Sequence, residues 1–135
     1  MSKELIRLKD CCMAYDDNVL ILDHINLYIN DKEFLTLLGP SGCGKTTTLR
    51  LIAGFLEPDT GDVVFEGKKI NGVPAFKRQV NTIFQRYALF PHLNVYENIA
   101  FGLRLKKWKE KDIKEKVSKM LTLVNLKGFG SRKID

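Results

Sequence analysis

The octapeptide GPSGCGKT at residues 39–46 is the feature that most limits how this chain can fold. It fits the pattern G-x-x-x-x-G-K-[ST] at every fixed position. A short apolar run, Phe34–Leu38, precedes it, as in a strand that is covered on both faces of a parallel sheet. After it we expect a helix that begins near Lys45 and ends at Gly54. The residues that we expect on the apolar face of this helix are Leu49, Ile52 and Ala53. The order strand, glycine-rich loop, helix predicts an α/β fold.

The spacing within the octapeptide suits the binding of a phosphate group. Gly39 permits a tight turn after the strand, while Gly42 and Gly44 let the backbone close around an anion. Successive N–H groups then point inward, and the positive end of the following helix adds to the attraction. Lys45 can reach the β- and γ-phosphates of a nucleotide, and the Thr46 hydroxyl can bind Mg²⁺. We therefore predict a nucleotide site with Mg²⁺.

Elsewhere the chain is β-rich before it becomes helical. The ranges that we expect to be strands, besides Phe34–Leu38, are residues 4–13, 19–22, 25–29, 62–65, 69–70 and 80–84. Two helices should follow, over Val95–Leu105 and Glu110–Asn125. In the second helix apolar side chains recur with helical spacing, at Ile113, Val117, Met120, Leu121 and Val124.

Composition excludes several other classes of protein. The chain has 135 residues, 44% of them apolar, and no apolar run approaches the roughly 18–20 residues that span a bilayer. With three cysteines, two histidines and no C-x-x-C, the sequence predicts neither a disulfide framework nor a metal-ligand cluster. The net charge of +6 is uneven: residues 103–135 carry 11 basic and 4 acidic side chains. We interpret this basic segment as the solvated face of a helix, near an anionic membrane surface, rather than a nucleic-acid footprint.

Three features resemble the nucleotide-binding domain of ABC transporters. Residues 39–47, GPSGCGKTT, match its Walker A motif in wording as well as in pattern. Tyr15, which lies 24 positions before Gly39, resembles the aromatic residue that stacks on adenine. Gln85 resembles the glutamine of the Q-loop. Within the family, residues 80–104 are most similar to the ATPase subunits of spermidine/putrescine importers. The ATPases of sugar and iron importers share many of the same short sequence segments.

The resemblance implies an ATP and Mg²⁺ site that these three features build together. Tyr15 would stack on adenine with Val19 beside it. Gln85 would contact Mg²⁺ and the attacking water, as a catalytic residue together with Lys45, and Thr46 would be the second Mg²⁺ ligand. The residues that would surround the phosphates are Gly39, Ser41, Gly42, Cys43, Gly44, Lys45, Thr46 and Thr47.

The resemblance also implies the fold, which is the α/β P-loop NTPase fold of ABC ATPases. We expect an N-terminal antiparallel β subdomain with the P-loop strand and helix over about residues 1–94. The start of the helical subdomain would occupy about residues 95–135. The LSGGQ signature, the Walker B motif and a C-terminal regulatory domain do not occur in the sequence. We therefore expect the N-terminal part of a longer ATPase, one that is inactive in hydrolysis by itself.

The implied partners are those of an importer at the cytoplasmic face of the cell membrane. The loop Gln85–Pro91 would contact the permease subunits, a second ATPase subunit would complete a homodimer, and a solute-binding protein would act indirectly. Alternatively, the aromatic side chains of this loop fill the local core. A soluble ABC ATPase that acts on nucleic acid or ribosomes stays open as an alternative function, as does a simple binding fragment. The D-x-x-G and N-K-x-D strings of GTPases are not found.

Overall fold

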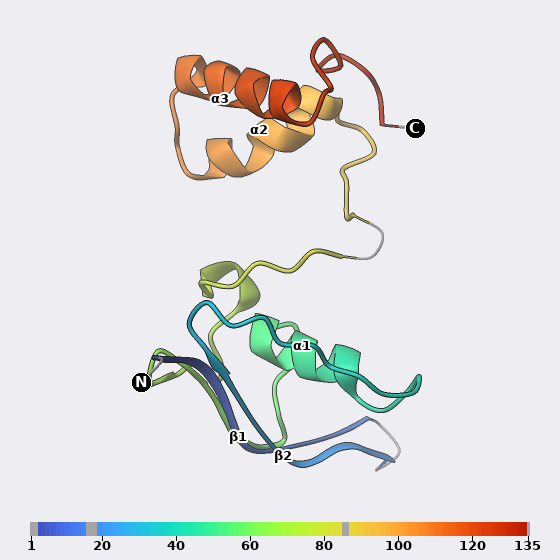
Figure 1. The fold of residues 1–135 in the computed structure, drawn as a ribbon, viewed down its shortest axis with the longest axis vertical. Helices are drawn as coiled ribbons and strands as arrows, with labels where there is room; N and C mark the ends of the chain where they lie inside the picture. The colour runs from blue at the N-terminus through green and yellow to red at the C-terminus, as the bar shows by residue number, and fades with distance from the viewer. Residues whose placement is uncertain (1–2, 16–18, 85–86, 135) are drawn as a thin grey trace. The chain divides into compact units, whose positions relative to one another are not determined.

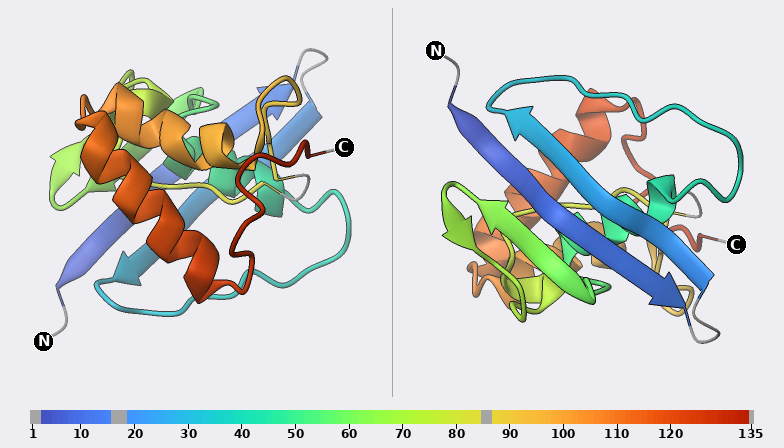
Figure 2. Two further views of the ribbon diagram at one scale, coloured as in Figure 1. Left: turned by 90° about the horizontal axis from the view of Figure 1, so that it is seen from above. Right: turned by 90° about the horizontal axis from the view of Figure 1, so that it is seen from below.

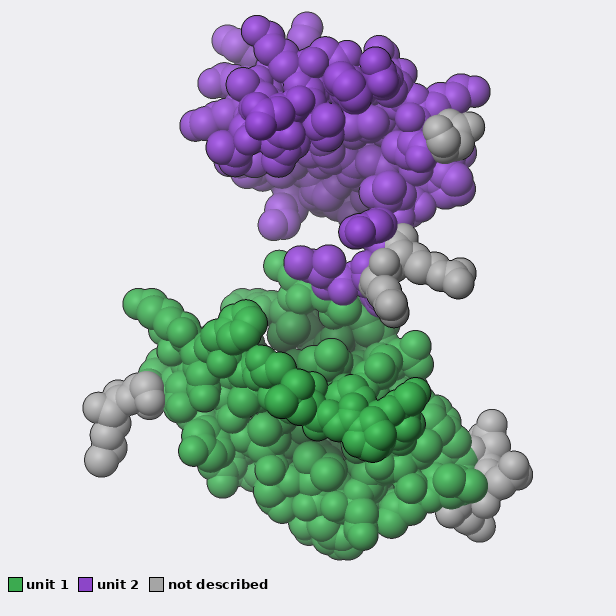
Figure 3. Space-filling model, turned by 45° about the vertical axis from the view of Figure 1, so that its right-hand side comes forward, with its two compact units in different colours: residues 1–82 green, residues 83–135 purple. Residues whose placement is uncertain are grey.

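The computed structural model describes residues 3–15, 19–84 and 87–134 (Figure 1). The chain forms two compact units, residues 1–82 and residues 83–135, coloured separately in Figure 3. Each unit has an apolar core of its own.

Unit 1 is built on an antiparallel sheet with the strand order β2-β1-β3-β4 (Figure 2). Its strands are β1 (Glu4–Tyr15), β2 (Val19–Asn30), β3 (Thr60–Phe65) and β4 (Lys68–Lys69). The two strands expected over residues 62–65 and 69–70 correspond to β3 and β4, which form a hairpin in which Phe65 pairs with Lys68. Glu66 and Gly67 between them both have positive φ, as the commonest two-residue hairpin turn requires.

Helix α1 (Lys45–Ala53) supplies the other side of the core of unit 1. Both expected ends are confirmed: the helix begins at Lys45, and Gly54 caps its C-terminus with φ 79°. The predicted apolar face is wrong at Leu49, which is exposed, while Leu51 is fully buried in its place. Three apolar positions in a nine-residue helix do not fix its rotation, because contacts with the sheet decide which side faces inward. The buried core residues are Leu8, Cys11, Met13, Leu22, Leu51, Ile52 and Val63.

The β1–β2 hairpin is interrupted by β-bulges. Cys11 pairs with Ile25 and Met13 pairs with Leu22, so Cys12 alone faces two residues of the other strand. β2 is one continuous strand across the point where the sequence pattern suggested two, and the bulge lies at that break in the alternation.

Two expected strands are wrong. Residues 34–38 and 80–84 both run as irregular chain. Phe34 and Leu38 are 94% and 87% exposed, and Ile83 is 92% exposed. An apolar run becomes a strand only where another strand hydrogen-bonds to it, and within the described residues the sheet consists of β1 to β4 alone.

Unit 2 consists of α2 (Val95–Leu105), α3 (Glu110–Leu123) and the segments around them. α2 was expected at these bounds, and α3 ends two residues earlier than predicted. Asn94 and Glu97 form a reciprocal capping box at the start of α2. The buried core residues are Ala100, Ile113, Val117 and Leu121. None of the helices in the described ranges combines the length and the apolar content needed to cross a bilayer.

Candidate functional site

The glycine-rich loop and the start of α1 form one wall of a pocket of about 500 Å³ in unit 1. This volume falls within the range of roughly 300–1,000 Å³ that is typical of small-molecule sites. The pocket is lined by Tyr15, Ile21, Ser41, Gly42, Gly44, Lys45, Thr46 and Thr47. It therefore brings the end of β1 and the start of β2 next to the loop.

Gly44 is the point where the loop presses against β2. It has φ 86° and ψ 0° as the N-cap of α1. A Cβ atom added there would lie 2.6 Å from Cδ2 of Leu22 and 3.1 Å from the carbonyl oxygen of Ile21. Because glycine also brings no capping side chain, the N–H groups of the first helical turn stay available to an anion. Both the N–H and the hydroxyl of Thr48 donate to the Gly44 carbonyl, at 2.8 and 3.0 Å.

The Lys45 ammonium group is held against the beginning of the loop. Its Nζ donates to the carbonyl oxygens of Gly39, at 2.7 Å, and Pro40, at 2.6 Å. The Sγ of Cys43 lies 3.5 Å from the same nitrogen. Gly39 has φ 154°, and a Cβ on it would come within 2.6 Å of that sulfur. The loop is thus folded tightly around a positive charge.

The remaining predicted loop residues differ in accessibility. Thr46 is exposed, so its hydroxyl can reach a cation in the pocket, while Thr47 is buried. Ser41 and Gly42 are exposed on the pocket wall. Cys43 is also exposed but is not among the lining residues.

Outside the loop, the structure brings one more predicted residue to the pocket. Tyr15 lies on its wall and is partly exposed. Val19 pairs with Tyr15 across the hairpin but does not line the pocket. Ile21 does, and the sequence analysis missed it. The available signal was its i+2 spacing from Val19, which places both side chains on one face of a regular strand. Gln85 lies outside the described residues, so its predicted contacts with Mg²⁺ and water are not placed.

Arg78 is a second residue that the sequence analysis missed, and it fixes the far end of α1. Its side chain is only 1% exposed. Nη1 donates to the carbonyls of Leu51, at 2.6 Å, and Ile52, at 3.2 Å. Nε donates to the Val73 carbonyl at 2.7 Å, and Nη2 pairs with Glu57 at 2.8 Å. A cation is favourable at the C-terminal end of a helix. In the sequence, Arg78 had no feature that set it apart from the other arginines.

In unit 2, the aromatic segment that follows residue 86 is partly packed and partly exposed. Phe90 packs on Phe101, with ring centroids 4.4 Å apart, and Asn98 bonds to its N–H and carbonyl groups. Tyr87 and Leu89 are exposed. Phe90 therefore has an aromatic neighbour but is itself 36% exposed and lies outside the core of unit 2, and Tyr87 and Leu89 are more exposed still.

A glycine-rich loop between β2 and α1, with a lysine at the helix start and a pocket beside it, is the arrangement of a phosphate-binding P-loop. The family profile described as "ABC transporter" matches residues 22–135. The chain belongs to the ABC transporter family.

The chain is also similar to curated relatives named "Spermidine/putrescine import ATP-binding protein PotA". It is 63% identical to that of Desulfitobacterium hafniense over 135 residues, which is all of this chain and 38% of the relative. It is 60% identical to that of Clostridium acetobutylicum over 131 residues, or 97% of this chain and 37% of the relative. The identity to that of Clostridioides difficile is 55%, over all of this chain and 39% of the relative. The chain thus spans well under half the length of these relatives.

Two solved structures share its fold. The ATP-binding cassette MJ0796, as a dimer in a post-hydrolysis state bound to ADP and phosphate, aligns with a TM-score of 0.82 and 25% identity. This alignment covers 96% of the present chain and 62% of that one. CbiO1 from Clostridium perfringens, part of the ABC transporter complex CbiONQ, aligns with a TM-score of 0.79 and 25% identity over 97% and 54% of the two chains. The expected fold class, an incomplete P-loop NTPase fold of the ABC ATPase type, is confirmed.

Proposed function

We propose that the pocket binds ATP with Mg²⁺, and that the chain acts within the ATP-binding subunit of an ABC importer for polyamines. The observation that carries this proposal is that residues of the P-loop, Lys45 among them, line one pocket together with Tyr15. Phosphates, a cation and an aromatic base can all be accommodated by such a set of groups.

Each group has a distinct task in this proposal. The amides from Gly42 to Thr46 donate to phosphate oxygens, aided by the positive end of α1. Lys45 neutralises the β- and γ-phosphates, and the exposed Thr46 hydroxyl is a ligand of Mg²⁺. Tyr15 stacks on the adenine ring, because a flat aromatic face suits a nucleobase. Of the other predicted loop residues, Thr47 lies on the buried side of the loop and Cys43 on its exposed side.

Hydrolysis of ATP is the finer part of the proposal. Phosphoryl transfer depends on placing the water and on stabilising the charge that develops. We assign Gln85 to the water and to Mg²⁺ on the basis of the family resemblance. A carboxylate that polarises the water and a signature segment from a second subunit are also needed. The sequence contains neither a Walker B motif, which would supply the carboxylate, nor an LSGGQ signature. We therefore expect no useful ATP hydrolysis by this chain alone.

The proposed partners are the permease subunits, through the segment from Gln85 to Pro91, and a second ATPase subunit. Exposed aromatic and apolar side chains are typical of an interface, and Tyr87 and Leu89 supply them here. An importer of this kind would act peripherally at the cytoplasmic face of the membrane with an extracytoplasmic solute-binding protein. Polyamines are the proposed solute because the relatives are named for spermidine and putrescine import. These names favour an importer over a nucleic-acid ATPase.

A nucleotide titration tests the site. We expect a fluorescent ATP analogue to bind the wild-type chain in the presence of Mg²⁺, and the Lys45→Ala variant to bind at least about tenfold more weakly, a loss of about 1.4 kcal/mol. Lys68→Ala is the matched control, because it removes the same charge from an exposed position on β4. Equal affinity of all three proteins would refute binding at the P-loop.

The role of Tyr15 needs a separate comparison. Tyr15→Ala should weaken binding of ATP more than that of inorganic triphosphate, because only ATP carries an adenine ring. Tyr28→Ala is the control: Tyr28 is also exposed on the hairpin, beneath the guanidinium of Arg7. Equal losses for ATP and triphosphate would contradict stacking.

Transport is tested with the complete gene product and its permease in membrane vesicles. We expect ATP-dependent uptake of labelled putrescine that competes with spermidine. Uptake of a sugar or of iron in place of polyamines would reassign the solute but leave the nucleotide site unaffected.

A further inference from the structure

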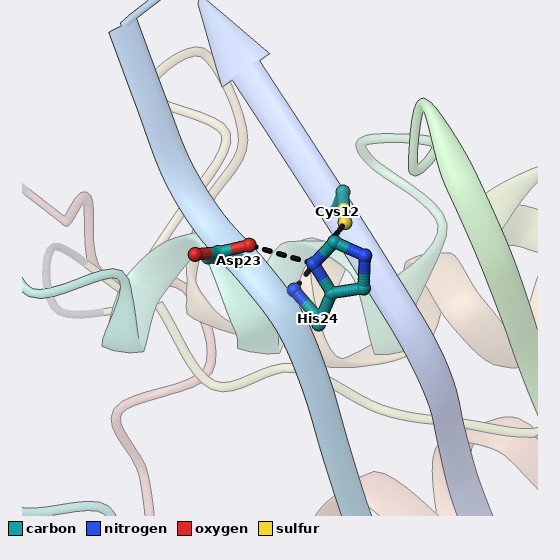
Figure 4. Close-up of side chains that lie close together, drawn as sticks. All are labelled: Cys12, Asp23 and His24. Atoms are coloured by element: carbon teal, nitrogen blue, oxygen red, sulfur yellow. Dashed lines mark hydrogen bonds and ion pairs between the residues drawn. The ribbon is translucent and has the colours of Figure 1, made fainter.

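A second cluster of chemically active side chains lies on the β1–β2 hairpin. Cys12 projects from β1, and Asp23 and His24 project from β2 toward it (Figure 4). The Nδ1 atom of His24 is 2.7 Å from Oδ1 of Asp23 and 3.4 Å from Sγ of Cys12. One donor atom from each of the three residues lies within 4.8 Å of the others. The side chains of Asp23 and His24 are 70% and 68% exposed, so the cluster is open to solvent.

The bulge in the hairpin explains how neighbouring residues come to share one site. Successive side chains of a regular strand point to opposite faces, so Asp23 and His24 could not both reach one partner. Here the pairs on either side leave Cys12 opposite both residues, and His24 adopts φ 46°. A bulge of this kind re-aims a side chain. Its effect is to bring one donor atom each from Asp23 and His24 to the same side as the sulfur of Cys12.

Backbone and side-chain bonds hold this arrangement in place. The N–H of His24 donates to Sγ of Cys12 at 3.3 Å, which holds that sulfur beside the His24 residue. Asn26 spans the two strands: its Nδ2 donates to the His24 carbonyl at 3.0 Å, and its Oδ1 accepts from the N–H of Asp10 at 3.1 Å. Asp10 is itself in a left-handed conformation, with φ 52°. Outer contacts that orient the groups are a regular part of protein metal sites.

We propose that Cys12, Asp23 and His24 form a binding site for a zinc-type divalent cation. With only two histidines and no paired-cysteine spacing, the sequence predicted no metal-ligand cluster. The proposal departs from that expectation at this hairpin, because the candidate ligands come from two strands and meet through the bulge. Sequence spacing does not reveal such a set.

The distances fit a small tetrahedral ion after a modest adjustment. Zinc bonds of about 2.3 Å to sulfur and about 2.1 Å to nitrogen or oxygen place the donors about 3.6 Å apart for S–N and about 3.4 Å apart for N–O. The observed S–N separation of 3.4 Å is already close. The N–O separation of 2.7 Å must open by about 0.7 Å. Both side chains are exposed, so rotation about their own bonds can supply this change.

The donor types decide which cations suit the site. A thiolate and an imidazole favour Zn²⁺, Co²⁺ or Cu²⁺, whereas Mg²⁺ and Ca²⁺ prefer oxygen ligands. Three protein ligands leave a fourth position for water. The site is chemically distinct from the proposed Mg²⁺ position at Thr46, which offers a hydroxyl and phosphate oxygens.

A cobalt titration of the intact chain without nucleotide tests the proposal. We expect one equivalent of Co²⁺ to bind and to give a thiolate-to-cobalt absorption band, which Zn²⁺ abolishes by displacement. Cys12→Ser should remove the band, and His24→Gln should weaken binding at least tenfold. Asn26→Ala should weaken binding by about 10–100-fold, the usual effect of removing an outer contact. Cys43→Ser and His92→Gln are the matched controls and should bind as the wild type does.

Two results would overturn the proposal: the absence of saturable Co²⁺ binding by the wild type, or a band that persists in Cys12→Ser and disappears in Cys43→Ser. If Cys12→Ser is unfolded by circular dichroism, Asp23→Asn decides instead. It keeps the thiol and changes only an exposed carboxylate. Unchanged Co²⁺ affinity in Asp23→Asn would then count against the three-ligand site.

Discussion

The buried guanidinium of Arg78 should be worth several kcal/mol to unit 1, although it lies outside the nucleotide pocket. We consider its replacement by methionine, which keeps an unbranched apolar stem but removes the charge. The change deletes hydrogen bonds to three backbone carbonyls and the ion pair with Glu57. The side chain of Glu57 is 46% exposed, so water can solvate its carboxylate and the ion pair itself adds little. The cost comes mainly from the buried carbonyls that lose a charged donor, and we expect a total of about 3–5 kcal/mol. Adding up each lost hydrogen bond separately, at about 1–3 kcal/mol, would overestimate the loss, since water can reach some of the freed carbonyls.

Arg50→Met is the matched control. Arg50 lies in the last turn of the same helix but is exposed, so its charge acts mainly on the helix dipole. Its loss should cost about 0.3–1 kcal/mol. Arg78→Lys is the intermediate variant, because it keeps the charge without the planar fork that bonds several carbonyls at once.

Hydrogen exchange read by mass spectrometry is the suitable assay. Trp108, the only tryptophan, belongs to unit 2, so unit 1 needs a probe that reads its own elements. For Arg78→Met we expect amide protection in α1 and β1 to fall by about 10²–10⁴-fold, at tenfold for each 1.4 kcal/mol. Exchange in α3 should not change. If Arg78→Met loses no more protection than Arg50→Met, the reasoning from burial and hydrogen bonding is wrong.

Three further predictions concern single residues. Gly44→Ala should weaken binding of the ATP analogue and lower the stability of unit 1 by about 1–3 kcal/mol, because it adds a clash with β2 to a left-handed backbone; unchanged affinity would contradict this. Asn94→Ala should destabilise unit 2 by about 0.5–2 kcal/mol through loss of the cap of α2, as measured by urea unfolding followed at Trp108. The hydrogen bond from Arg104 holds the pKa of Glu110 below its ordinary value. This pair therefore stabilises unit 2 fully at a pH above the ordinary pKa of a glutamate, and the stabilisation is lost as the pH falls through the lowered pKa. A carboxyl NMR titration should show the pKa of Glu110 return to its ordinary value in Arg104→Gln.

Features that depend on neighbouring residues were predictable from the sequence. The ends of α1 follow from Gly44 and Gly54, and the start of α2 follows from its capping box. The phosphate loop was equally accessible, because its groups lie within eight consecutive residues and the backbone itself does the binding.

Features that depend on residues far apart in the sequence were not predictable from it. Residues 34–38 and 80–84 have apolar patterns typical of covered strands, yet the pattern does not supply the strand that must pair with them. Arg78 acts on a helix end that lies 26 positions away in the chain. Tyr15 was found only through resemblance to a family, since an aromatic residue at a strand end more often packs than binds a ligand.

The contacts of Lys45 determine what its substitution can reveal. Its ammonium group donates two hydrogen bonds, to the carbonyls of Gly39 and Pro40, and these bonds link the start of α1 to the beginning of the loop. Much of the entropy cost of ordering the loop is therefore met before a nucleotide arrives, which raises affinity without any new contact. Lys45→Ala removes this ordering together with the charge. A fall in affinity in that variant should thus contain an entropic part, visible in calorimetry as a more unfavourable −TΔS, beyond the lost attraction for phosphate.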